Sequence, residues 1–221
     1  MRKIRYRVLS MLLAAFLLLP GICSARTYYS PECQLVIDIP AKFRVYDLAD
    51  NPDMVAYKKD RLEKYRFHAP FGLEAEAAGD KVHISIFDAG TIPASVSLET
   101  LELFALDLKK YAINPVVGES YRSFKSEGDG LLQIFCIDGY KNWSVTDMNA
   151  NKRNSVRIYS VFAERRHICI LFEFMDGQFK ANEYSDAIVT TANLIGREIN
   201  LANGVDYGAD YKAISRSSPQ A

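Results

Sequence analysis

The sequence has few histidines and lacks the short motifs that mark common catalytic sites. Only three histidines occur in 221 residues, and none belongs to an HxxxH, HExxH or Cys/His pattern, so no local metal site is indicated. The GxSxG, GxGxxG and GxxxxGK[ST] motifs are absent, which removes the local signatures of serine hydrolases and nucleotide-binding proteins. There is also no CxxC pair, so neither a thioredoxin-like site nor a zinc knuckle is indicated. We predict no catalytic residue, no metal and no cofactor.

The chain also lacks an excess of charge of either sign. It has 27 Lys and Arg residues against 27 Asp and Glu residues. The first 25 residues hold four basic residues and no acid, so the remaining 196 residues carry a net charge of −4. This balance excludes a uniformly basic nucleic-acid-binding protein, and we expect no nucleic-acid partner.

Residues 1–25 have the layout of a secretory signal peptide. A basic start is followed by the apolar run Val8–Leu19, and Cys23 and Ala25 place small residues before a cleavage site. An apolar run of about 12 residues is too short to span a bilayer, so no transmembrane segment is expected after cleavage. The alternative, a lipid anchor on Cys23, is disfavoured by the bulky Ile22 before it. We therefore predict a secreted or periplasmic protein.

The rest of the chain is predicted to form one α+β domain over residues 26–196 and a loosely ordered tail over residues 197–221. Hydrophobic periodicity and turn residues predict strands over residues 34–39, 43–46, 81–88, 121–125, 131–138, 140–147, 155–164 and 167–175.

Two helices are predicted around these strands. Ser97 is a suitable N-cap for a helix over residues 98–112, and a closing helix over residues 180–195 ends before Gly196. The expected fold is therefore a central antiparallel meander sandwiched by two main helices.

Three cysteines remain after cleavage: Cys33, Cys136 and Cys169. Because the number is odd, at least one is a free thiol or forms an intermolecular bond. Cys136 and Cys169 both lie in predicted strands, so a disulfide between them is one interpretation. Buried free thiols are the other.

One segment is locally basic. Residues 139–170 contain six basic and two acidic residues, a net charge of +4. Together with a nearby tryptophan they form a candidate partner-binding face for an acidic envelope protein or an anionic headgroup surface. The alternative is a solvated hairpin whose charges protect β-rich segments from aggregation. The candidate residues are Lys141, Trp143, Lys152, Arg153, Arg157, Arg165 and Arg166.

The order of elements resembles a known family. The matching segments are IDIPAKFRVYD, then KVHISIF, then the helix SLETLELFALDLKKY, and finally a meander followed by NLI. This layout is similar to the PsbP-like fold, which is shared by the photosystem protein PsbP, the Ran-binding Mog protein and bacterial envelope proteins of the DcrB type. The resemblance implies a sheet covered by helices and a role in binding or stabilising other proteins.

Our preferred hypothesis is a non-enzymatic protein that binds or stabilises a partner in the cell envelope. One alternative is a hydrolase or metal-dependent enzyme whose site is built from scattered residues such as His83, His167 and acids. Another is a carrier that lines an apolar cavity with its aromatic residues, which make up 12% of the chain.

Overall fold

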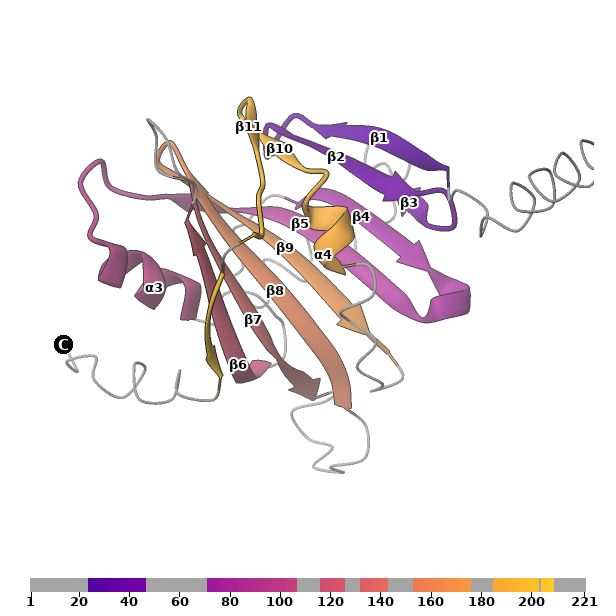
Figure 1. The fold of residues 1–221 in the computed structure, drawn as a ribbon. Helices are drawn as coiled ribbons and strands as arrows, with labels where there is room; N and C mark the ends of the chain where they lie inside the picture. Colours follow the sequence, from indigo (N-terminus) through magenta and orange to yellow (C-terminus); the bar gives the residue numbers. More distant parts are fainter. Residues whose placement is uncertain are drawn as a thin grey trace, which may run out of the picture.

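The computed structural model describes residues 24–46, 71–106, 116–125, 132–142, 153–175, 185–202 and 204–208. Within these residues the protein is mostly β, with an antiparallel sheet of eight strands and one of four (Figure 1). The strand order is β12-β6-β7-β8-β9-β5-β4-β3 in the large sheet and β1-β2-β10-β11 in the small sheet. The strands are β1 (Ala25–Ser30), β2 (Leu35–Pro40), β3 (Arg44–Tyr46), β4 (Phe71–Ala77), β5 (Val82–Thr91), β6 (Val116–Lys125), β7 (Leu132–Asn142), β8 (Arg153–Ala163), β9 (Arg166–Phe174), β10 (Asn193–Leu194), β11 (Arg197–Glu198) and β12 (Val205–Gly208).

The predicted α+β fold, with two main helices around a central sheet, is wrong. The described residues contain two α-helices, α3 (Leu98–Leu106) and α4 (Ser185–Val189), and the short 3-10 helix η1 (Ala78–Asp80). α4 has five residues, whereas the pattern predicted a helix over residues 180–195. One face of the large sheet is covered mainly by the small sheet, so the protein is built from two sheets.

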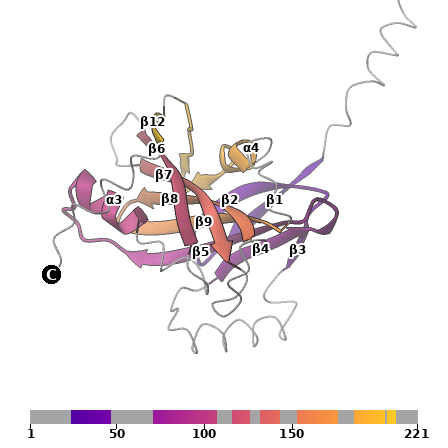
Figure 2. The ribbon, with the colours of Figure 1, turned by 90° about the horizontal axis from the view of Figure 1, so that it is seen from below.

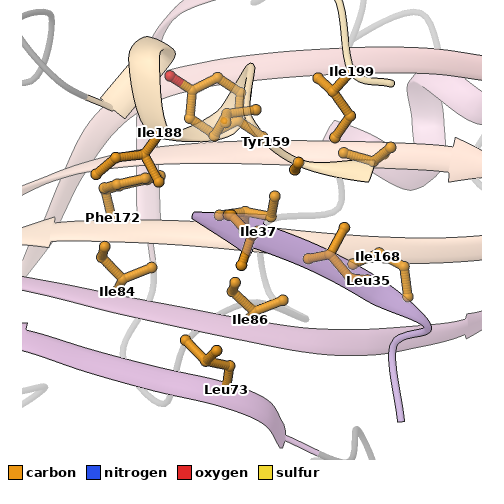
Figure 3. Packing of buried hydrophobic residues seen from close by; sticks show 14 of the residues in the cluster. Leu35, Ile37, Leu73, Ile84, Ile86, Tyr159, Ile168, Phe172, Ile188 and Ile199 are labelled. Carbon is orange, nitrogen blue, oxygen red and sulfur yellow. The ribbon is translucent and has the colours of Figure 1, made fainter. Parts of the chain in front are cut away.

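The larger hydrophobic core lies between these two sheets. Strand β2 contributes Leu35 and Ile37, which lie over Ile84 and Ile86 of β5 (Figure 3). Ile188 of α4 belongs to the same core. Alternate residues of each strand enter it, because successive side chains of a strand point to opposite faces of the sheet.

A smaller core lies on the other face of the large sheet, under α3. Leu101 and Ala105 of this helix are fully buried there. The helix begins as predicted, since the Thr100 N–H donates to Ser97 Oγ at 3.2 Å, which is an N-cap bond. Figure 2 shows α3 and the β1–β2 pair on opposite sides of the molecule.

Cys136 and Cys169 lie on opposite faces of the large sheet. Cys136 faces the larger core and Cys169 the smaller one. β8 runs between their strands, pairing Tyr159 with Cys136 and Ser160 with Cys169. Two strand spacings of about 4.8 Å each, with opposed side chains, exceed the reach of a disulfide. The predicted disulfide is therefore wrong, and both cysteines are buried free thiols, as is Cys33.

Two predicted turn and cap positions have other roles. Asp138 and Gly139 lie inside the long strand β7, where Gly139 pairs with Val156 instead of forming a turn. Gly196 was predicted to cap a helix, but it follows Ile195 in the two-residue turn between β10 and β11. Both of these residues have positive φ, +54° and +79°, which defines a type I′ hairpin turn. The segment predicted to finish a helix thus completes the small sheet.

The fold starts and ends at different residues from those predicted. β1 begins at Ala25, the last residue of the predicted signal peptide, and residues 1–23 lie outside the described part. The predicted tail contributes β11, the buried Ile199 and β12, which pairs with β6. Residues 209–221 of the tail lie outside the described residues.

Candidate protein-binding surface

Arg157, one of the seven predicted partner-binding residues, is buried. Its guanidinium forms a bidentate ion pair with Asp138, with Nε to Oδ1 at 2.5 Å and Nη2 to Oδ2 at 2.7 Å. Only 2% of the Arg157 side chain is exposed. The paired N–H groups of arginine match the two oxygens of a carboxylate, which makes this a strong, directional contact. Arg157 is therefore removed from the predicted binding face.

The same arginine also anchors the first turn of α4. Its Nη1 donates to Asp186 Oδ1 and to Ser185 Oγ, both at 3.2 Å. The Tyr159 hydroxyl donates to Asp186 as well, and Arg122 Nη1 reaches Asp186 Oδ2 at 3.4 Å. This ionic cluster, made of these five residues and Asp138, connects β6, β7 and β8 to α4.

The electrostatics of the ionic cluster favour its charged form. Burial alone would raise the pKa of Asp186, but the hydrogen bond from Tyr159 and the charge of Arg122 lower the pKa below its usual value. Burial likewise opposes the charge of Arg157, yet its hydrogen bonds to Asp138 raise its pKa. Burial also raises the pKa of the neighbouring Cys136 thiol to about 12. These shifts fit a cluster that holds α4 on the sheet.

Arg166 is also engaged within the protein. It forms an ion pair with Asp88 of β5, and its Nη2 donates to the carbonyl of Glu32 at 2.6 Å. A fifth of its side chain is exposed. Arg166 therefore connects the start of β9 to the turn between β1 and β2.

The locally basic segment is partly neutralised by acids from elsewhere in the chain. The partners of Arg157 are Asp138 and Asp186, and the partner of Arg166 is Asp88. All three acids lie outside residues 139–170, so a charge count along the sequence misses them.

The predicted basic residues do not form one face. Lys141 and Arg153 lie at one end of the β7–β8 hairpin, and Arg165 and Arg166 lie at the other end of β8. Eleven residues of strand separate the two ends by about 35 Å. Trp143 and Lys152 lie outside the described residues.

Arg165 belongs instead to a group of three turns. We call residues 31–34, 164–165 and 195–196 the turn cluster; they connect β1 to β2, β8 to β9 and β10 to β11. Figure 1 shows the first and third of these turns close together. The Ile195 N–H donates to the Gln34 carbonyl at 3.2 Å. Arg197, next to the third turn, pairs with Glu164 of the second at 2.9 Å.

The turn cluster concentrates unusual backbone conformations. The described residues include five non-glycine residues with positive φ, and four of them lie here: Gln34 (50°), Glu164 (44°), Arg165 (71°) and Ile195 (54°). Each left-handed residue with a side chain costs about 1–2 kcal/mol. A β-branched residue such as Ile195 is especially rare in the left-handed conformation. Strained residues of this kind persist where the surroundings hold them, and they gather at functional sites.

Four side chains of the turn cluster are presented to solvent. Glu32, Gln34, Glu164 and Arg165 are all exposed. The Arg165 Nε also approaches the carbonyl of Ile92 at 3.5 Å. The surface thus combines both charges and an amide on a backbone held by an ion pair and interturn hydrogen bonds.

Sequence reasoning found only part of this surface. It placed Arg165 and Arg166 at a turn, but the segment containing Ile195 and Gly196 was assigned to a helix. The usual signals for a type I′ turn are Asn-Gly and Asp-Gly, and the Ile195-Gly196 pair shares only the glycine with them. The turn formed by Glu164 and Arg165 carries no such signal.

The scattered-site enzyme hypothesis required the two histidines to converge. His83 pairs with Glu173 and His167 with Gly90, so six residues of β9, about 20 Å, separate them. His167 is buried, stacks on Phe162 with ring centroids 4.2 Å apart and contacts Cys169. The two histidines therefore do not share a site.

Two features are missing from the described residues. These residues include no group of three or more His, Cys, Asp or Glu side chains placed to hold a metal ion. Among the same residues, no helix has the length and apolar character needed to cross a membrane. The packed cores on both faces of the large sheet hold the protein's own side chains, which is not the arrangement the carrier hypothesis requires.

Comparisons with known proteins find similarity among solved structures. No family model matches the sequence, and no curated protein matches it. Among solved structures, the chain is similar to the solution structure of the cyanobacterial PsbP protein (CyanoP) from Synechocystis sp. PCC 6803. The identity is 11% and the TM-score 0.47, and the match covers 80% of this chain and 95% of that chain. The resemblance to Mog and DcrB-type proteins stays a prediction.

Proposed function

We propose that this chain is a non-enzymatic protein of the cell envelope that binds a protein partner through the turn cluster. The observation that carries the proposal is the gathering of four left-handed, side-chain-bearing residues at three connected turns. The basic start and apolar run of the leader support a periplasmic or secreted location.

The energetic argument concerns why these positions are not glycine. Glycine adopts positive φ at no steric cost and is the usual choice in type I′ turns. Glu164 and Arg165 occupy both central positions of such a turn, at φ 44° and 71°. Keeping side chains there sacrifices stability, and contact with a partner explains why they are present. Interfaces of this kind favour arginine.

The chemistry of the surface suggests a polar, protein-like contact. Arg165 and Glu32 present opposite charges, and Gln34 adds an exposed amide. Such a mixed surface suits a folded protein with complementary charges better than a uniformly anionic bilayer, which calls for several basic residues together. Lys141 and Arg153, at the other end of β8, stay candidates for a second contact, as do Trp143 and Lys152, which lie outside the described residues.

The test is affinity capture from detergent-free and detergent extracts of the protein's own cell envelope. The bait is residues 24–221, which omits residues 1–23 of the predicted leader and keeps every described contact. We expect a stoichiometric partner that binds the unchanged bait and is lost by at least tenfold with Arg165→Glu. Circular dichroism checks that the variant is folded.

Lys81 provides a matched control. It is also basic and exposed, and it has positive φ (53°), but it lies at the far end of β5 from the turn cluster. Lys81→Glu makes the same change of charge and should capture the partner as well as the unchanged bait. Equal capture by Arg165→Glu and the unchanged bait would overturn the assignment of the surface, and an empty capture would overturn the proposed function.

A further inference from the structure

Strand β1 is the one long outer strand among the described residues. It lies at the edge of the small sheet and has six residues, whereas β11 has two, β3 three and β12 four with a bulge. Proteins usually protect sheet edges with short strands, charged side chains, prolines or bulges, because unpaired N–H and C=O groups bind other strands. β1 has the sequence ARTYYS, which contains no proline and pairs with β2 without a bulge, and Arg26 is its one charged residue.

The hydrogen bonds around β2 establish which groups of β1 point outward. The Asp38 N–H donates to Thr191 Oγ1 at 3.0 Å, on the side of β2 away from β1. Its partner on β1, Thr27, therefore belongs to a pair that exchanges no hydrogen bonds with β2. The Ala41 N–H donates to the Ser24 carbonyl at 2.7 Å, so the main-chain groups of Ser24 point toward the β2 side. Because these directions alternate from one residue to the next along a strand, this bond leads to the same assignment for Thr27. Ala25, Thr27 and Tyr29 thus direct their N–H and C=O groups to the outer edge.

We propose that β1 pairs with β1 of a second copy of this chain, antiparallel and with Thr27 on the two-fold axis. In this register Thr27 faces Thr27, and Ala25 of each copy faces Tyr29 of the other. These are the residues whose N–H and C=O groups point outward, so each pair exchanges two main-chain hydrogen bonds. The two small sheets join into one continuous sheet.

The side chains favour a second copy as the occupant. Arg26, the one charged residue of β1, faces Tyr28 of the other copy, so no like charges oppose each other. On the outer face, Tyr29 is 62% exposed and Val36, its neighbour on β2, is 36% exposed. Pairing places this apolar pair beside the small Ala25 and the Pro40 of the other copy. The strand is therefore complementary to itself in charge and in shape.

The experiment traps the pair with a disulfide in residues 24–221. In a hydrogen-bonded antiparallel pair the two Cα atoms at position 27 are about 5.5 Å apart, within disulfide range. The three native cysteines in residues 24–221 are buried, so Thr27→Cys supplies the exposed thiol. Under mild oxidation with copper phenanthroline, we expect Thr27→Cys to form covalent dimers at least tenfold faster than Val36→Cys, which is exposed but one strand further from the edge.

Proline separates main-chain pairing from contact by the side chain. The Tyr29 N–H points outward, so Tyr29→Pro keeps the β1–β2 hydrogen bonds and removes an intermolecular donor. Adding Tyr29→Pro to Thr27→Cys should lower the covalent dimer at least fivefold, while Tyr29→Ala should lower it less. Equal trapping of Thr27→Cys and Val36→Cys, or trapping insensitive to Tyr29→Pro, would overturn the proposal.

Sedimentation of the unmodified chain should show a concentration-dependent dimer, and a monomer at all concentrations would equally overturn it. Arg165→Glu should leave trapping unchanged, so this test is independent of the proposed partner.

Discussion

At the residue scale, Arg157 illustrates why the predicted binding face had to change. The period of β8 places its side chain on the same face of the sheet as Tyr159 and Val161, both in the larger core. The sequence contains Asp138 and Asp186, but their distance from Arg157 along the chain hides the pairing. A count of charges within residues 139–170 includes neither partner, because Asp138 belongs to β7 and Asp186 to α4.

Removing this buried cation should strongly destabilise the fold. Arg157→Met leaves Asp138 and Asp186 in place without their shared partner, and breaking a buried ion pair on one side costs about 3–5 kcal/mol. The free energy of unfolding from urea titrations measures this. Arg165→Met, at an exposed position, should change it by less than about 1 kcal/mol. Equal effects of the two substitutions would show that the ionic cluster does not stabilise the protein.

The ionic cluster also predicts how stability depends on pH. The pKa of Asp186 is lower in the folded protein than in the unfolded chain, because Tyr159 and Arg122 stabilise its carboxylate against the cost of burial. Its contribution to stability is therefore present above the unfolded pKa, about 4, and is lost as the pH falls toward the folded value. Asp186→Asn should flatten the loss of stability between pH 4 and pH 2, as measured by urea midpoints. An unchanged acid slope would contradict this role.

At the element scale, strands with a period-two pattern were predictable, and the pairing of strands from distant parts of the chain was not. Residues 81–88 and 155–164 alternate clearly, and β5 and β8 form there. β10 and β11 escaped prediction because two-residue strands have no period, and because β10 joins β2 from a remote part of the chain. Asp138 lies at a predicted turn, but in the structure it is inside β7, where its side chain pairs with Arg157.

The attachment of β12 depends on a close approach at Gly204. A Cβ atom on Gly204 would lie 2.2 Å from Cε1 of Phe124, which is buried in the larger core. Gly204→Ala should therefore displace β12 or the ring and lower stability by about 1–3 kcal/mol. A Cβ on Gly79 meets nothing within 4 Å, so Gly79→Ala provides the control with little effect. Thermal unfolding of both variants measures the difference, and equal melting temperatures would show that the contact with Phe124 is relaxed at no cost.

At the scale of the whole molecule, two sheets packed face to face bring three turns to one place. This convergence needs the pairing of β10 with β2 and the ion pairs of Arg166 and Arg197, none of which has a local pattern. The strand periods and the start of α3 could be read from residues alone. The turn cluster could not, because it is assembled from segments that lie up to about 160 residues apart along the chain.

The central claim is that strain in the turn cluster is kept for binding, and Arg165→Gly tests it most directly. Glycine relieves the left-handed strain at φ 71° but increases the entropy of the unfolded chain, so the net gain in stability should be about 0.5–1 kcal/mol. The decisive measurement pairs urea unfolding with partner capture on this one variant. We predict that stability rises while capture falls at least tenfold. A variant that binds its partner as well as the unchanged chain would contradict the claim.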